Sequence, residues 1–106
     1  MSNGAICIAS WNVNSLRRRM KALGWLVAER DPDILCLQET RVKDPLFPKT
    51  EIAALGYQHQ AFTGMKAHNG VAILSKFPLL DVETKDWRDQ DDCRHILASV
   101  VTGELL

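Results

Sequence analysis

Short apolar runs and one longer periodic stretch set the pattern of this chain. Residues Ala5 to Trp11 (AICIASW) are mostly apolar and include two β-branched isoleucines, which predicts a strand buried on both faces. After a short polar segment, apolar side chains recur at spacings of four, three and four residues, at Leu16, Met20, Leu23 and Val27. This period is typical of an amphipathic helix, which we expect to run from about Leu16 to Arg30 with Asn14 or Ser15 as its N-cap.

A proline separates this helix from a second apolar run. Pro32 disfavours helical dihedrals at Asp31, and residues 33–38 (DILCLQ) predict another short strand. A strand, a helix and a strand in this order form a crossover unit, whose two strands are parallel. The sequence therefore predicts an α/β fold.

The remaining predicted elements are shorter. We expect a short helix at residues 50–55, ended by Gly56 in a left-handed conformation, and a turn at residues 68–70. Further strands are expected at residues 57–62, 70–74, 80–84 and 96–101. Because no helix separates these strands, we expect antiparallel neighbours, and thus a mixed β-sheet with flanking helices.

The composition agrees with one globular domain. Of the 106 residues, 46% are hydrophobic and 25% are charged. The apolar runs are too short to cross a membrane and the amino terminus lacks a secretory pattern, so we expect a cytoplasmic protein with no membrane partner. The three cysteines have no metal-ligand spacing, which argues against a zinc site, and Cys7 and Cys36 are expected to be small core residues.

The formal net charge is zero, but the charges are unevenly distributed. Through Lys76 the chain has ten Lys or Arg and six Asp or Glu, whereas from Phe77 onward it has three and seven. Part of the basic excess is a short run at the start of the predicted helix: Arg17, Arg18, Arg19 and Lys21. Such a run suits either contact with phosphates or simply a solvated helix face.

Oxygen-bearing side chains follow both predicted parallel strands. Asn12 and Asn14 come after the first strand and Glu39 after the second, and the ends of parallel strands meet at one edge of a sheet. Mg²⁺ is commonly held by one or two carboxylates together with water and phosphate oxygens, so these residues are candidate metal ligands. Arg17 and Arg41 lie at the same edge and suit a phosphodiester. The residue types alone also allow a helix cap, a turn and a solvated glutamate at these positions.

Two segments carry a resemblance. SWNVNSLR at residues 10–17 and DILCLQET at residues 33–40 resemble the first two signature blocks of the exodeoxyribonuclease III and apurinic endonuclease family, within the endonuclease, exonuclease and phosphatase superfamily. The likeness continues in collinear order through NGVAILSK at residues 69–76 and RHILASV at residues 94–100. It implies that residues 1–106 are the amino-terminal, incomplete portion of such a domain, one half of a four-layer α/β sandwich.

The resemblance implies roles for the matching residues. Glu39 matches the metal-binding glutamate, Asn12 the asparagine of the catalytic site, and Asn14 a position near the metal. Basic positions near the DNA backbone are matched by Arg17 and Arg41. A loop that approaches DNA is matched by His68, Asn69 and Gly70, although the first of these positions often holds an aromatic residue in relatives.

The implied reaction is hydrolysis of a phosphodiester of double-stranded DNA, at abasic sites or 3′ ends, with Mg²⁺ or Mn²⁺ as cofactor. A carboxylate committed to a metal is a poor base, so another group must orient the water, and none of His59, His68 and His95 matches a catalytic position. The GDxN block and Asp-His pair that complete the site in relatives do not occur in this sequence. We therefore expect little turnover from this chain alone and a carboxy-terminal half as a complementing partner.

Two other functions stay open. The chain could bind a metal or the DNA backbone weakly without catalysis. It could also belong to another branch of the superfamily, such as the phosphoinositide phosphatases or deadenylases, which share the glutamate. The arginine of WNVNSLR and the QETRV segment favour the DNA-repair branch.

Overall fold

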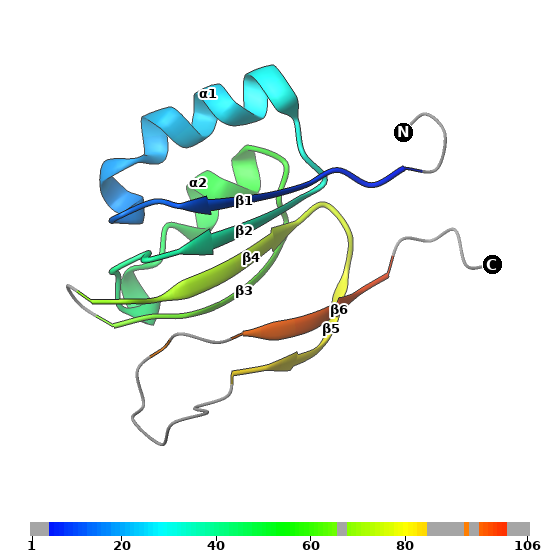
Figure 1. Ribbon diagram of the computed structural model, residues 1–106. Coiled ribbons are helices and arrows are strands. Elements are labelled where there is room, and N and C mark those ends of the chain that lie inside the picture. Colours follow the sequence, from blue (N-terminus) through cyan, green and yellow to red (C-terminus); the bar gives the residue numbers. More distant parts are fainter. Residues whose placement is uncertain (1–4, 66–67, 85–92, 94–95, 102–106) are drawn as a thin grey trace.

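The computed structural model describes residues 5–65, 68–84, 93 and 96–101. Its main element is a four-stranded sheet in the order β1-β2-β4-β3, shown in Figure 1. The strands of this sheet are β1 (Ile8–Asn12), β2 (Ile34–Gln38), β3 (His59–Thr63) and β4 (Val71–Ser75). A separate two-stranded sheet contains β5 (Leu79–Glu83) and β6 (Leu97–Val100).

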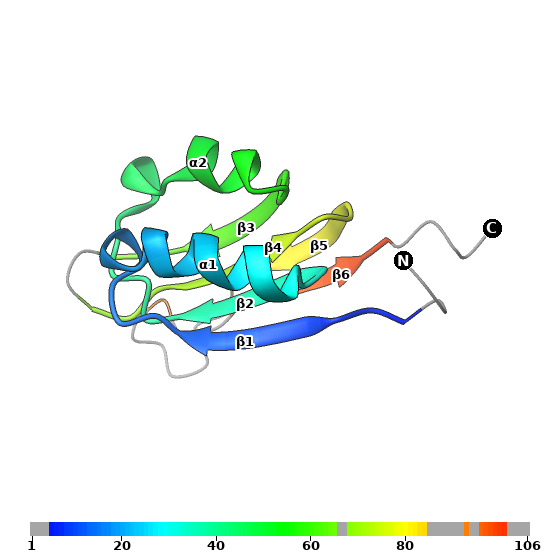
Figure 2. The same cartoon turned by 90° about the horizontal axis from the view of Figure 1, so that it is seen from above.

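Strand directions confirm the predicted mixed sheet and the α/β class. β1 pairs with β2 in parallel, whereas β2 and β3 both pair with β4 in antiparallel. The helical elements are η1 (Leu16–Arg18), α1 (Met20–Arg30), η2 (Asp44–Leu46) and α2 (Lys49–Ala54). Figure 2, seen from above, shows α1 running roughly along the strands with α2 beyond it on the β3 side, while Figure 1 shows the β5–β6 pair at the opposite side of the sheet from α1. No helix of the described residues is long and apolar enough to span a membrane.

The core lies between the helices and the middle of the sheet. Leu35 and Leu37 of β2 are almost fully buried, as is Leu74 of β4. They pack in one cluster with Leu23 of α1 and Ile52 of α2. Each such side chain contributes roughly 1.5–3 kcal/mol through burial, so this cluster holds both helices on one face of the sheet.

The prediction that the first strand is buried on both faces was wrong. Ile8 is 62% exposed, and exposed and half-buried residues alternate along β1. The reason is its place at the edge of the sheet, where β2 is its only neighbour among the described strands and one face packs toward α1. Cys7, just before β1, is likewise exposed rather than a core residue, whereas Cys36 is half-buried.

The predicted continuous helix from Leu16 to Arg30 is split by Arg19, which has φ −109° and ψ 9°. The predicted side-chain cap at Asn14 or Ser15 is also absent from the first turn. Backbone carbonyls take its place, because Ser15 N–H donates to Glu39 O (2.8 Å) and Leu16 N–H to Thr40 O (2.9 Å). The start of the helix is thus tied to the loop that follows β2.

Tyr57, predicted as the first residue of a strand, lies outside β3 and in the core. Its hydroxyl donates to Pro32 O at 2.6 Å, and burial raises the pKa of Tyr57 to about 12. The bond joins the start of β2 to the segment before β3. Gly56 before it has φ +112°, which confirms the predicted left-handed conformation there.

Candidate functional site

Three side chains meet where β1 and β2 end. The parallel register places Asn12 opposite Gln38, so Glu39 is the first residue beyond the pair. Asn12 Nδ2 donates to Glu39 Oε2 at 2.8 Å, and Arg41 Nη2 donates to Glu39 Oε1 at 2.9 Å. Each carboxylate oxygen of Glu39 is therefore held by one hydrogen bond. Asn12 and Glu39 meet at the sheet edge where the parallel strand order predicts them.

These contacts favour the charged form of Glu39. The hydrogen bond from Asn12, and then the hydrogen bond and positive charge of Arg41, hold the pKa of Glu39 below its usual range. The side chains of Arg41 and Glu39 are 39% and 38% exposed. A pair this accessible adds little to stability, so its effect is to orient the carboxylate.

The loops at this edge adopt an unusual backbone conformation. Among the described residues, eight non-glycine residues have positive φ, and six of them are at this edge: Asn14, Ser15, Glu39, Arg41, Asn69 and Cys93. Left-handed conformations are unfavourable for most of these residue types, and they concentrate at functional sites where surrounding bonds enforce them. Here the enforcing bonds include Arg41 N–H to Asn69 O at 2.8 Å.

The turn before β4 closes the site from the other side. Thr40 N–H donates to Gly70 O at 3.1 Å, and Gly70 has φ +93°. A Cβ on Gly70 would lie 2.2 Å from Thr40 Oγ1. Glycine is therefore required here both for its dihedral angle and for the close approach of Thr40.

These side chains surround a cavity of about 390 Å³, lined by Asn12, Gln38, Glu39, Asn69, Gly70, Val71 and Cys93. The structure thus brings together four of the residues singled out in the sequence. Asn14 is not among the lining residues, and its contact with the site is through the backbone, from its N–H to Asn12 Oδ1 at 3.1 Å. His68 is exposed and does not line the cavity either.

Three lining residues were missed: Gln38, Val71 and Cys93. Gln38 follows from the strand register, since it stands opposite Asn12 and shares its face of the sheet. Cys93 has no such signal in the sequence, because a long segment separates it from Gly70, whose N–H donates to its carbonyl at 3.0 Å. The backbone contact between Gly70 and Cys93 can be identified only from the structure.

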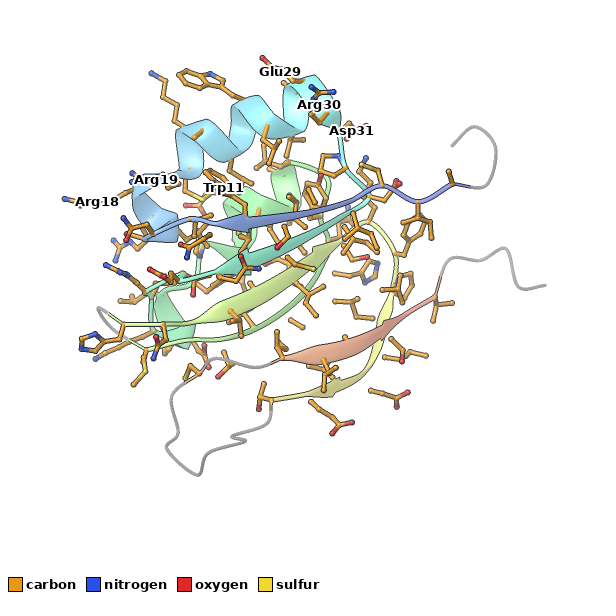
Figure 3. All side chains as sticks on the ribbon, viewed as in Figure 1. Trp11, Arg18, Arg19, Glu29, Arg30 and Asp31 are labelled. Atoms are coloured by element: carbon orange, nitrogen blue, oxygen red, sulfur yellow. The ribbon has the colours of Figure 1, made fainter. Side chains whose placement is uncertain are left out.

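The predicted basic residues separate into two groups. Arg17 and Arg41 line a second, smaller pocket of about 150 Å³ beside the first. Arg18 and Arg19 lie at the start of the helical segment in Figure 3, with Arg30 at the opposite end of α1. Within the described residues, only Arg17 and Arg41 of the predicted basic positions therefore line a pocket at this edge.

The donor set suits a hard divalent cation. Glu39, Asn12 and Gln38, whose side chains carry carboxylate and amide oxygens, line the cavity, and Mg²⁺ prefers oxygen ligands. The described residues contain no group of three or more His, Cys, Asp or Glu side chains that could enclose a metal. Glu39, the one carboxylate that lines the cavity among the described residues, could hold a cation together with water and substrate oxygens.

Comparisons with known proteins agree with this geometry. Residues 9–106 match the Endonuclease/Exonuclease/phosphatase family. The chain is 42% identical over 67 residues to exodeoxyribonuclease III of Haemophilus influenzae, covering 63% of this chain and 25% of that protein. It is 37% identical over 90 residues to the DNA repair nuclease APEX1 of Danio rerio, covering 80% and 29%.

Solved structures share the fold. A 3′-5′ exonuclease of Neisseria meningitidis superposes with a TM-score of 0.83 at 37% identity, covering 90% of this chain and 38% of that one. An AP endonuclease of Archaeoglobus fulgidus gives 0.81 at 39% identity, covering 91% and 37%. This chain thus spans well under half the length of the proteins it matches.

Proposed function

Because this chain belongs to the endonuclease/exonuclease/phosphatase family, we propose that it supplies the metal-side half of a site that hydrolyses phosphodiesters of double-stranded DNA. The observation that carries this proposal is the pair of hydrogen bonds from Asn12 and Arg41 to the two oxygens of Glu39. They present a charged carboxylate to an open cavity. The names of the relatives, a DNA repair nuclease and an exodeoxyribonuclease, support DNA as the substrate.

Each residue has a defined task in this proposal. Glu39 holds the cation, Asn12 keeps the carboxylate in position, and Arg41 and Arg17 attract the phosphate backbone. A bound Mg²⁺, or Mn²⁺ in its place, would stabilise negative charge on the phosphate and the leaving oxygen. Asn14 is proposed as a more distant metal-side residue. Asn69 and Gly70 would contact the DNA from the turn before β4, with His68 exposed beside them.

The group that orients the attacking water is not among the described cavity residues. Glu39 is committed to the cation and to two hydrogen bonds, so it is a poor proton acceptor. His59 pairs with Ser75 at the end of the β3–β4 pair that is remote from the cavity. The end nearer the cavity is marked by Thr63, which pairs with the cavity residue Val71. His95 lies outside the described residues. We therefore propose that a carboxy-terminal half completes the site.

Cleavage of an abasic-site duplex in Mg²⁺ tests this function. The chain is assayed alone and mixed with the remaining carboxy-terminal part of the Haemophilus influenzae relative. We expect product only in the mixture, with a loss on the order of a hundredfold for Glu39→Ala. The matched control is Glu29→Ala, which removes an exposed carboxylate near the carboxyl end of α1 (Figure 3) and should leave the rate unchanged.

Other outcomes are equally informative. Product from the chain alone, lost in Glu39→Ala, would mean that residues 1–106 contain their own water-activating group. Salt-sensitive DNA binding without product in any mixture would favour the non-catalytic function. Equal loss in Glu29→Ala and Glu39→Ala would contradict the assignment of Glu39 to the metal.

A second candidate activity is removal of a 3′ phosphate from DNA. A structural neighbour at 38% identity is described as a 3′ phosphatase bound to a product DNA hairpin. The same cavity would then receive a terminal phosphate in place of an internal phosphodiester. A hairpin with a 3′ phosphate, supplied to the same mixture, distinguishes the two activities by whether free phosphate or a shortened strand is released.

A further inference from the structure

A second pocket beside the Glu39 cavity has a strongly basic lining. It measures about 150 Å³ and is lined by Arg17, Arg41, Val42, Lys43 and Leu46. Three of these five side chains carry positive charge and none carries negative charge. Three cationic residues around one small concavity attract an anion.

Neighbouring carboxylates offset only part of the positive charge of this pocket, because Glu39 pairs with Arg41 whereas Arg17 and Lys43 form no ion pair among the described residues. Glu39 faces the other cavity, where its oxygens accept hydrogen bonds from Asn12 and Arg41. Asp44 follows Lys43 in the chain, but its Oδ1 accepts a hydrogen bond from Gly64 N–H at 2.8 Å. Neither carboxylate lines the basic pocket.

The loop that carries Lys43 is held on both sides. Val42 is buried, and a Cβ on Gly64 would lie 2.1 Å from Val42 O, so the two backbones pack closely. Beyond Lys43, the ring of Phe47 stacks on Phe62 with centroids 3.9 Å apart and planes 5° apart. Lys43 thus extends from a segment whose backbone is fixed before a ligand arrives, which lowers the entropic cost of binding.

Arg41 connects the two pockets. One of its terminal nitrogens donates to Glu39 at 2.9 Å, and the same side chain lines the basic pocket. A guanidinium has five N–H donors, so the bond to Glu39 leaves several for a second acceptor. A group bound in the basic pocket would therefore be the immediate neighbour of a group bound at Glu39.

We propose that the pocket formed by Arg17, Arg41 and Lys43 binds a phosphate group, and that in the substrate this is the backbone phosphate adjacent to the one at Glu39. The inference rests on the proposed function and adds Lys43 as a DNA-positioning residue. Val42 and Leu46 supply the apolar part of the pocket lining. Successive phosphates held in neighbouring pockets fix the register of the strand without reading its sequence.

The first test measures DNA binding by fluorescence anisotropy with a labelled abasic duplex in EDTA, over a series of salt concentrations. Lys43→Gln should weaken binding roughly fivefold and lower the slope of log K against log salt by about one. Arg30→Gln is the matched control, since it removes the same charge from an exposed residue at the far end of α1 (Figure 3). Equal effects in the two variants would overturn the proposal, because only the overall charge would then matter.

The second test uses inorganic phosphate and does not depend on DNA. Titration of the ¹⁵N-labelled chain should shift the amide signals of Arg41, Val42 and Lys43, and Lys43→Gln should abolish these shifts. If the chain binds no DNA but these shifts occur, the proposed function fails for this chain while the phosphate pocket stands. Absence of the shifts would overturn the pocket, even if Glu39-dependent cleavage is observed.

Discussion

Glu39 adopts a backbone conformation that glutamate rarely takes, with φ +55°. Its own carbonyl accepts from Ser15 N–H at 2.8 Å, and two residues later Arg41 N–H donates to Asn69 O at 2.8 Å. The conformation of Glu39 is therefore imposed by segments that follow β1 and precede β4. A residue held in this way keeps its side chain aimed at the cavity before any ligand is present.

The hydrogen bond from Asn12 gives a prediction about protonation. Asn12→Ala should raise the pKa of Glu39 toward its usual range and weaken Mg²⁺ binding by roughly tenfold. A carboxyl whose pKa is lower in the folded state stabilises the fold above its unfolded pKa, and this contribution is lost as pH falls through the folded pKa. Because the folded-state pKa of Glu39 is higher in Asn12→Ala, this stabilising contribution is smaller in the variant and is fully lost at a higher pH than in the unaltered chain.

A ¹³C NMR titration of the Glu39 carboxyl measures this shift directly. Ser10→Ala is the control, since Ser10 is exposed on the same strand and its hydroxyl accepts a hydrogen bond from Gln38 but makes none with Glu39. An unchanged titration of Glu39 in Asn12→Ala would show that Arg41 alone sets its pKa.

Gly70 gives a second prediction at this scale. Gly70→Ala combines a φ of +93° with a Cβ placed 2.2 Å from Thr40 Oγ1, whereas Gly56→Ala has a φ of +112° in open space. We expect Gly56→Ala to lower the free energy of unfolding by about 1 kcal/mol and Gly70→Ala by at least about 2 kcal/mol. Urea denaturation measures both, and equal losses would mean that Thr40 moves aside at no cost.

At the scale of elements, the spacing of apolar residues identifies the helix but not its start. Leu16 and Leu23, both in the predicted stripe, are fully buried. The split at Arg19 was not predictable from the spacing, because the first N–H groups bond to carbonyls of residues 39 and 40, which are remote in sequence. Capping rules consider only neighbouring side chains, so they placed the cap at Asn14 or Ser15.

For the strands too, the sequence predicts the positions along the chain but not the neighbours in space. Apolar runs and turn residues located the six strands of the described residues within two residues, except that β1 begins three residues later than predicted. They did not show that β1 is an edge strand or that β5 and β6 form their own sheet. Apolar runs report burial in general and not which neighbour supplies it. The positions of Asn12 and Glu39 in the site could be predicted, because both residues follow parallel strands that end at one edge of the sheet. The position of Cys93 could not, because it depends on a backbone hydrogen bond to Gly70, which is remote in sequence.

Helix α1 contains a glycine with no structural task. Gly24 lies inside α1, and a Cβ built there meets no atom within 4 Å. Gly24→Ala should raise the free energy of unfolding by about 0.5–1 kcal/mol, because alanine loses less backbone entropy in a helix. Thermal unfolding followed by circular dichroism checks this; a lower midpoint would indicate that the helix packs more closely than its contacts suggest.

At the scale of the whole molecule, several large apolar side chains face solvent. Ile8 on β1 is 62% exposed, and Leu80 and Leu97 on β5 and β6 are each 52% exposed. β1 is also an edge strand, with β2 as its only neighbour in the described sheet. Exposed apolar residues on an unpaired edge are a surface that favours association with another chain.

We therefore predict that the isolated 106-residue chain self-associates and that Ile8→Lys reduces this. A lysine on an edge strand opposes strand pairing through its charge and its hydration. Sedimentation velocity over a range of protein concentrations measures the fraction of monomer. Glu83→Lys, at an exposed position of β5, is the control for added positive charge, and an equal rise in monomer there would show that charge repulsion is responsible instead of the β1 surface.

The position of Arg41 between two pockets has a thermodynamic consequence. Its guanidinium neutralises part of the charge of Glu39 and also lines the basic pocket, so an anion bound there draws on the same group. Any change that phosphate causes in cation affinity must equal the change that the cation causes in phosphate affinity, because the two ligands close one free-energy cycle. Substrate backbone and cofactor would thus bind as linked ligands, with one arginine setting the sign and size of their cooperativity.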